Sequence, residues 1–157
     1  EEYETAVDLD VDAYIPDSYI RNEMQKLDVY KRIAGIRNQE EYEDMLEELL
    51  DRFGEMPKPV QNLLAVARLK AGAHRLYMTE VNQKGNELWF VMYEKAKINT
   101  GAIDGLLKEY KGNLKFVMDA PPYFLYKELR KNKNETVDIL ALAAELLGAF
   151  AVLREDA

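Results

Sequence analysis

The stretch from Asn38 to Gly72 constrains the fold most, because it predicts two helices joined by a short turn. Apolar residues recur through its first half at i, i+3, i+4, i+7, i+8 and i+11, the spacing of one stripe along an α-helix: Tyr42, Met45, Leu46, Leu49, Leu50 and Phe53. Asn38 can cap the start of this helix, and Gly54 can adopt the left-handed conformation that ends it. A second helix can begin at Pro59, so we expect a helical hairpin at the centre of the core.

Three carboxylates fall near the C-terminal end of the first helix of this hairpin, on the face away from the apolar stripe: Glu47, Glu48 and Asp51. The partial negative charge of a helix C-terminus disfavours each of them by about 0.3–1 kcal/mol when they are exposed. Their placement therefore does not serve folding. They form either a solvated acidic face, which is the commoner case, or a surface presented to a basic partner.

The rest of the chain predicts an α+β (mixed α/β) fold, with the helical hairpin and further helices packed on a small, mostly antiparallel sheet. Periodicity and turn residues predict a strand over 7–13, then a helix capped by Asp17 or Ser18 and ending at Gly35, and then the helical hairpin. They next predict a β-hairpin around 82–86 whose first strand includes Leu76, and a short helix capped by Asn99 or Thr100. The last predicted elements are strands at 114–118 and 123–126 and a helix from Asn134 or Thr136 to about Arg154. We treat 1–157 as a single domain, with one strand and three helices in 1–72 and the remaining elements in 73–157.

Composition excludes several classes of function. The formal net charge of −8 argues against DNA or an anionic membrane as the main partner, because both attract basic surfaces. The absence of cysteine removes disulfides and thiolate chemistry and fits the reducing cytoplasm. No apolar run is long enough to cross a membrane, and no signal-peptide pattern is present. Because the chain starts at Glu1 without a methionine, we expect it to be a piece of a longer polypeptide.

No set of residues predicts catalysis, cofactor binding or a metal site. The single serine, Ser18, is explained by helix capping, and the single histidine, His74, is explained as a structural or surface residue. The alternating aspartates at 8, 10 and 12 lack the glycine and glutamate of a calcium loop. A small-molecule enzyme with a carboxylate site remains open, and a deep pocket holding two carboxylates with raised pKa values would favour it. A second rival is nucleic-acid contact through the basic loop 127–133, which contains Lys127, Arg130, Lys131 and Lys133.

Several stretches resemble, in order and spacing, the C-terminal module of the bacterial transcription-repair coupling factors. They are residues 13–20 (Ala-Tyr-Ile-Pro-Asp-Ser-Tyr-Ile), 26–34 (Lys-Leu-Asp-Val-Tyr-Lys-Arg-Ile-Ala), 48–54 (Glu-Leu-Leu-Asp-Arg-Phe-Gly), and Pro57 with 62–64 (Asn-Leu-Leu). In the second half the resemblance is limited to the helix near Thr100 and the turn at 119–121. Lys26 stands where the family has arginine, and Ala120 stands where it has glycine.

The resemblance implies a parent protein that is an ATP-driven DNA translocase, acting on stalled RNA polymerase in the cytoplasm and recruiting excision repair, with ATP and Mg²⁺ held upstream of Glu1. It implies that this module has no catalytic residue or cofactor of its own. The module would dock on the UvrB-like N-terminal domain of the same protein, cover the surface used for UvrA and restrain the motor. By motif the docking residues are Glu48 and Asp51, with Glu47 beside them. No membrane contact or direct nucleic-acid binding is implied, and loop 127–133 is the alternative.

Overall fold

The structure is a computed structural model that describes residues 3–155. The chain forms two compact units, which are a sheet unit (residues 3–10 and 73–155) and a helical unit (Val11–Gly72). The first strand lies in the sheet unit, whereas the sequence-based subdivision grouped it with the first three helices. Five α-helices and one five-stranded, mostly antiparallel sheet are found in the described residues, which confirms the predicted α+β fold class.

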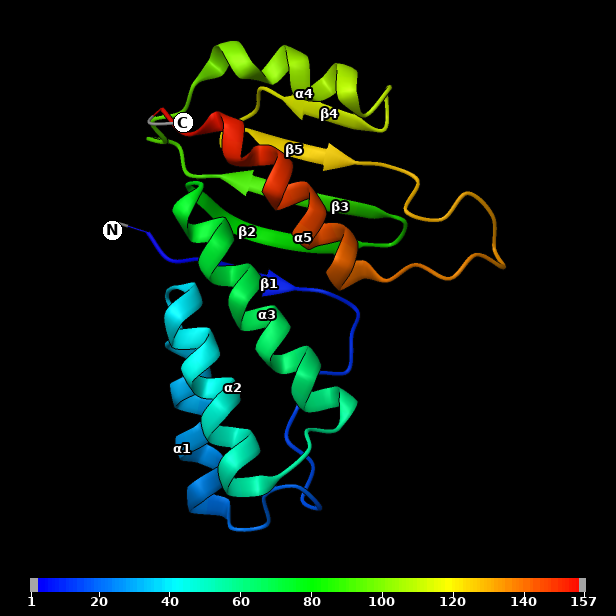
Figure 1. Cartoon of the computed structure of the whole chain (residues 1–157). Helices are drawn as coiled ribbons and strands as arrows, with labels where there is room; N and C mark the ends of the chain where they lie inside the picture. The colour runs from blue at the N-terminus through cyan, green and yellow to red at the C-terminus, as the bar shows by residue number, and fades with distance from the viewer. Residues whose placement is uncertain (1–2, 156–157) are drawn as a thin grey trace. The chain divides into compact units, whose positions relative to one another are not determined.

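The sheet has the strand order β1-β2-β3-β5-β4 (Figure 1). Its strands are β1 (Ala6–Asp8), β2 (Met78–Lys84), β3 (Glu87–Met92), β4 (Leu114–Val117) and β5 (Tyr123–Tyr126). β1 runs parallel to β2, and the other three pairings are antiparallel. The predicted β-hairpin turns at Gly85, whose φ of 58° is the left-handed value that a two-residue hairpin turn requires.

One face of the sheet is covered by α5 (Ile139–Ala149) and the 3₁₀ turn Phe150–Leu153 that follows it (Figure 1). Phe150 is fully buried there, with its ring centroid 5.0 Å from that of Phe90 and 4.8 Å from that of Phe124. The prediction that this helix starts at Asn134 or Thr136 is wrong, because the N-cap is Asp138, whose Oδ1 accepts the Ala141 N–H. A further helix, α4 (Ile103–Glu109), follows the predicted cap Asn99 and a 3₁₀ turn (Thr100–Ala102) and contacts β4.

The opposite face of the sheet carries a stacked aromatic pair, Trp89 and Tyr123, whose ring centroids are 4.4 Å apart. Side chains alternate along a strand, so Trp89 points away from the face on which Phe90 meets α5. The ammonium group of Lys84 lies 4.2 Å from the Trp89 ring centroid, and the indole N–H donates to Glu87 Oε1 at 3.0 Å. Tyr123, Lys84 and Glu87 therefore all contact the Trp89 side chain.

The helical unit contains α1 (Glu23–Ala34), α2 (Gln39–Phe53) and most of α3 (Lys58–Arg75). The limits predicted for α2 are confirmed, because Asn38 Oδ1 accepts the Glu41 N–H and Gly54 takes a φ of 85°. The core of the unit joins buried residues of all three helices, of the segment before α1 and of the connection between α1 and α2: Ile15, Ile20, Val29, Ile33, Ile36, Met45, Leu49, Val60, Leu64 and Ala67. Each large aliphatic side chain buried there contributes roughly 1.5–3 kcal/mol.

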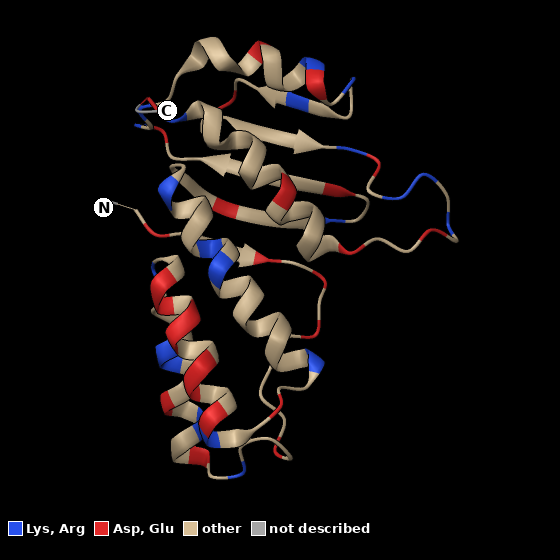
Figure 2. Cartoon of the chain, in the orientation of Figure 1, with Lys and Arg blue, Asp and Glu red and all other residues tan. Residues whose placement is uncertain are grey.

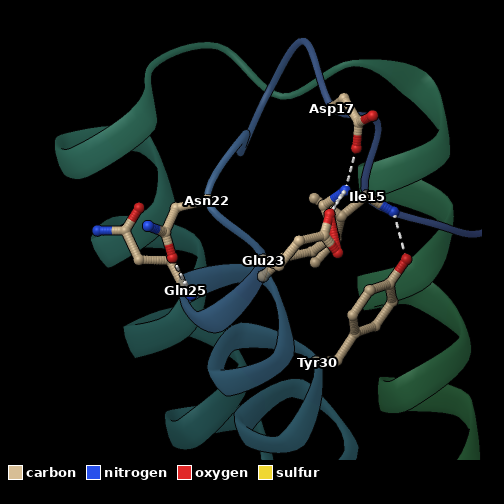
Figure 3. Close-up of polar contacts among 7 residues, drawn as sticks. Ile15, Asp17, Asn22, Glu23, Gln25 and Tyr30 are labelled. Carbon is tan, nitrogen blue, oxygen red and sulfur yellow. Dashed lines mark hydrogen bonds and ion pairs between the residues drawn. The ribbon is translucent and has the colours of Figure 1, made fainter.

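The first helix begins later than predicted. Asp17 and Ser18 do not cap it; the cap is Asn22, whose Oδ1 accepts the Gln25 N–H at 2.9 Å (Figure 3). The Asp17 carboxylate instead pairs with the ammonium group of Lys26, which lowers the pKa of Asp17. The segment 11–22 is therefore held against α1 by side chains, without being helical itself.

The first strand is shorter than predicted. Only Ala6–Asp8 pairs with β2, and beyond it the Asp10 N–H donates to the side-chain oxygen of Gln83. Leu76 does not lie in β2 either, because α3 reaches Arg75 and the chain turns at Tyr77, which has a φ of 62°. Among the described residues, no helix has the length and apolar character that a bilayer crossing requires.

Candidate docking surface

Carboxylates line the outer side of α2 along most of its length (Figure 2). Four of them, which we call the acidic stripe, follow the spacing i, i+4, i+7 and i+11: Glu40, Asp44, Glu47 and Asp51. That spacing puts them on one line along a helix, opposite the buried residues Met45 and Leu49. All four are exposed, and none has an ion pair or hydrogen-bond partner among residues 3–155.

Glu48 differs from the acidic stripe because it is bound within its own chain. Arg32 of α1 donates from Nη1 and Nη2 to both of its carboxylate oxygens, at 2.5 Å from Nη1 to Oε2. Arg52, one turn further along α2, donates from Nη1 to Oε2 at 2.9 Å. The Glu48 side chain is 29% exposed. We call these three residues the Arg32–Glu48–Arg52 cluster; it fastens α1 to α2.

The electrostatics of this cluster are the reverse of an acidic patch. Two guanidinium groups surround one carboxylate, so the cluster carries a net charge of +1. Hydrogen bonds from the two arginines lower the pKa of the Glu48 carboxyl from 4.5 to about 2, and the bond from Arg32 makes the larger contribution. Most of its capacity to accept hydrogen bonds is already used. Glu48 therefore stays ionised, but the two arginines of its own chain neutralise the negative charge that it could present to a partner.

The structure thus separates the three predicted docking residues. Glu47 and Asp51 lie on the acidic stripe and are accessible, whereas Glu48 points toward α1. Sequence reasoning missed Glu40 and Asp44, although their spacing to Glu47 and Asp51 could have shown that the four share a line. It also missed the role of Arg32, which lies sixteen residues before Glu48.

The basic loop between β5 and α5 is fixed to the sheet by its backbone. Asn86, in the β2–β3 turn, accepts the Arg130 N–H at 2.7 Å and donates to the Arg130 carbonyl at 2.8 Å. Asn113, before β4, donates to the Lys127 carbonyl at 3.1 Å. These contacts use backbone groups of the loop, and the side chains of Arg130, Lys131 and Lys133 are exposed.

His74 has a structural role at the end of α3. The Thr5 hydroxyl donates to the Met78 carbonyl at 2.6 Å, so its contact of 2.9 Å with His74 Nδ1 requires that nitrogen to carry the proton. The ring also stacks on Tyr3, with centroids 4.4 Å apart. Within the described part of the chain, no group of three or more His, Asp or Glu side chains is placed to hold a metal ion.

Comparison with known families identifies the chain. The family model described as the TRCF domain matches residues 9–103, more than half of the sequence. The chain belongs to the TRCF domain family. A curated relative, the transcription-repair-coupling factor of Bacillus subtilis (strain 168), is 36% identical over 105 residues, covering 67% of this chain and 9% of its own. That of Escherichia coli (strain K12) is 34% identical over 126 residues, covering 74% of this chain and 11% of its own.

The fold of this TRCF domain is also similar to a solved structure. The crystal structure of a C-terminal domain of transcription-repair coupling factor has a TM-score of 0.72 and 26% identity, covering 98% of this chain and 96% of the other. The match includes the sheet unit, where the sequence resemblance was weakest. This TRCF domain spans about a tenth of the length of the curated relatives it matches.

Proposed function

We propose that this TRCF domain is a non-catalytic, autoinhibitory docking module of a transcription-repair coupling factor. It docks on the UvrB-like N-terminal domain of the same protein, masks the UvrA-binding surface and restrains the DNA translocase motor. The parent protein displaces RNA polymerase stalled at lesions and recruits nucleotide excision repair. Membership of the family supports this parent, and the acidic stripe on α2 supports docking.

The observation that carries the proposal is the exposure of the acidic stripe where folding opposes it. Asp51 and Glu47 lie in the last two turns of α2, where exposed carboxylates cost about 0.3–1 kcal/mol each. Neither carboxylate has an ion-pair partner within the described residues. A partner carrying arginines at the matching spacing would neutralise the stripe and remove this repulsion.

The cluster of Arg32, Glu48 and Arg52 changes the roles within the predicted docking set. Glu47 and Asp51 contact the partner, with Glu40 and Asp44 extending the line. Glu48 supports docking indirectly, without contacting the partner. It fixes α1 against α2 and binds Arg32 and Arg52, whose charges would otherwise repel a basic partner. Truncating one member of a buried interfacial charge pair costs about 2–5 kcal/mol, so loss of two stripe residues weakens docking more than tenfold.

The test mixes the domain with the UvrB-like domain of its own parent and measures affinity by calorimetry. Glu47→Gln combined with Asp51→Asn is compared with Glu94→Gln combined with Asp119→Asn, which removes the same charge from exposed positions of the sheet unit. We expect at least tenfold weaker binding for the first pair and less than twofold for the second. In the whole protein the first pair should raise ATP turnover and UvrA binding. Equal effects of the two pairs would refute the assignment.

A further inference from the structure

The three connections at one end of the sheet form a surface whose charge is opposite to that of the chain as a whole. They are the β2–β3 turn (84–87), the segment leading into β4 (110–115) and the β5–α5 loop (127–138), and together we call them the basic end. The basic end contains seven Lys and Arg against four Asp and Glu, a net charge of +3 in a chain of −8.

The register and the hydrogen bonds bring these segments together. Leu88, Leu114 and Tyr126 are paired neighbours in β3, β4 and β5, so the segments beyond them leave the sheet side by side. The Lys127 N–H donates to the Asn113 carbonyl at 2.8 Å, and the Leu129 N–H donates to the Asn86 carbonyl at 3.0 Å. The three segments that carry the cations of the basic end therefore lie side by side.

The loop that supplies most of these cations is held in place, which matters because ordering a mobile loop would cost binding free energy. Besides the two bonds from Asn86, the Lys131 N–H donates to Glu135 Oε1 at 2.6 Å, and Leu129 is 8% exposed. None of these contacts uses a cationic side chain of the loop. The side chains of Arg130, Lys131 and Lys133 are exposed and have no ion-pair partner among residues 3–155.

A cavity of about 300 Å³ opens beside the same loop. Its lining contains two cations, Arg130 and Lys133, and two carboxylates, Asp10 and Glu135. The other lining residues are the uncharged polar Gln83, Asn134 and Thr136 and the apolar Leu129, Val137 and Ile139. The Asp10 N–H donates to the side-chain oxygen of Gln83, and the Glu135 carboxylate accepts the Lys131 N–H. Cations for a phosphate, a carboxylate for sugar hydroxyls and an apolar wall for a base are the groups that one unstacked nucleotide needs.

We propose that the basic end binds the phosphate backbone of nucleic acid, with one unpaired nucleotide seated in this cavity. The net charge of the chain does not prevent this, because exposed charges further away than a Debye length of about 10 Å are largely screened at 0.1 M salt. The inference is independent of the docking proposal, which concerns α2, and it replaces the expectation from composition that this domain does not contact nucleic acid directly. Four phosphate contacts would give a slope of log K against log salt of about −3 for a single strand.

The test is fluorescence anisotropy with a labelled 20-nucleotide single strand and a 20-base-pair duplex, between about 25 and 200 mM salt. The triple variant Arg130→Ser, Lys131→Ser, Lys133→Ser keeps every backbone contact of the loop. We expect it to bind at least tenfold more weakly and with a shallower salt slope. Its control, Lys58→Ser, Lys95→Ser, Lys97→Ser, removes the same charge from exposed positions elsewhere and should bind within twofold of wild type.

The cavity is tested separately by Asn134→Ala combined with Thr136→Val, which leaves the charge unchanged. Tighter binding of the single strand than of the duplex, with that preference lost in the double variant, supports a seated nucleotide. Equal binding of the two probes would overturn the role of the cavity. No salt-dependent binding, equal losses in the two triple variants, or binding only to anionic lipid vesicles would overturn the nucleic-acid surface as a whole.

Discussion

Removing the charge of Glu48 tests whether the Arg32–Glu48–Arg52 cluster is structural. Glu48→Gln keeps the shape of the side chain and eliminates the carboxylate that accepts from both arginines. A pKa lowered from 4.5 to about 2 corresponds to about 3 kcal/mol between the two protonation states. The side chain is 29% exposed, so solvent screens much of this, and about 1 kcal/mol is the expected loss in the free energy of unfolding at pH 7.

The pH dependence has a definite sign. Because the folded-state pKa of Glu48 is lowered, its contribution is fully present above the unfolded-state value of 4.5. It is lost as the pH falls from about 4.5 to about 2, where the carboxyl becomes protonated in the folded state as well. The difference between wild type and Glu48→Gln should therefore be constant from pH 7 to 5 and shrink at lower pH.

The assay is urea unfolding followed by far-UV circular dichroism between pH 2.5 and 7. Glu47→Gln is the matched control, because it removes the same charge from the neighbouring position on the acidic stripe, where the side chain has no partner among residues 3–155. We expect less than about 0.5 kcal/mol for the control. Equal losses in the two variants, or a Glu48→Gln deficit that does not diminish below pH 4.5, would refute the structural role of Glu48.

Two further predictions concern the packing of each unit. Leu49→Ala, at a fully buried position of α2, should lower the free energy of unfolding by about 2–5 kcal/mol. Leu50→Ala, at a 49% exposed position, should lower it by less than about 1 kcal/mol. Similar denaturation midpoints for the two variants would contradict the orientation of α2. Gly85→Ala should cost about 1–2 kcal/mol, since its φ of 58° strains any residue with a Cβ, and an unchanged melting temperature would show that the turn has another geometry.

The parts of the fold that depend on local chemistry could be predicted from the sequence. α2 starts at its predicted cap and stops at Gly54, because capping, the apolar stripe and the glycine all act within a few residues. The strands β4 and β5 were predicted for the same reason, since each lies between residues that break regular structure. The fold class follows once the order of such elements is known.

The predicted boundaries are wrong where a contact outside the nearest few residues engages the group that the local pattern assigned. Asp17 has a side chain suited to an N-cap, but its carboxylate binds Lys26, and α1 begins only after its N-cap Asn22. The alternating pattern after Asp8 predicts a longer strand, but β1 ends at Asp8 although β2 continues to Lys84. The Asp10 N–H bonds to the Gln83 side chain and not to the β2 backbone. Local pattern cannot reveal these competitors.

For the candidate docking surface too, local pattern places some residues correctly and not others. Glu47 and Asp51 could be placed on the outer side of α2 from helical periodicity alone, and the structure agrees. Glu48 could not be excluded from that surface by any local rule, because the deciding contact comes from Arg32 on another helix. That contact also turns a residue expected to face a partner into one that fixes its own fold.

The chain contains one tryptophan, and its place on the sheet makes it a selective optical reporter. Trp89 emission depends on Tyr123, Lys84 and Glu87, all within the sheet unit, and the last two belong to the basic end. An oligonucleotide settling against those groups would alter the emission directly, whereas a protein captured along α2 would be detected only by its effect on anisotropy. A single cuvette could thus distinguish the two surfaces without attaching any dye to the domain.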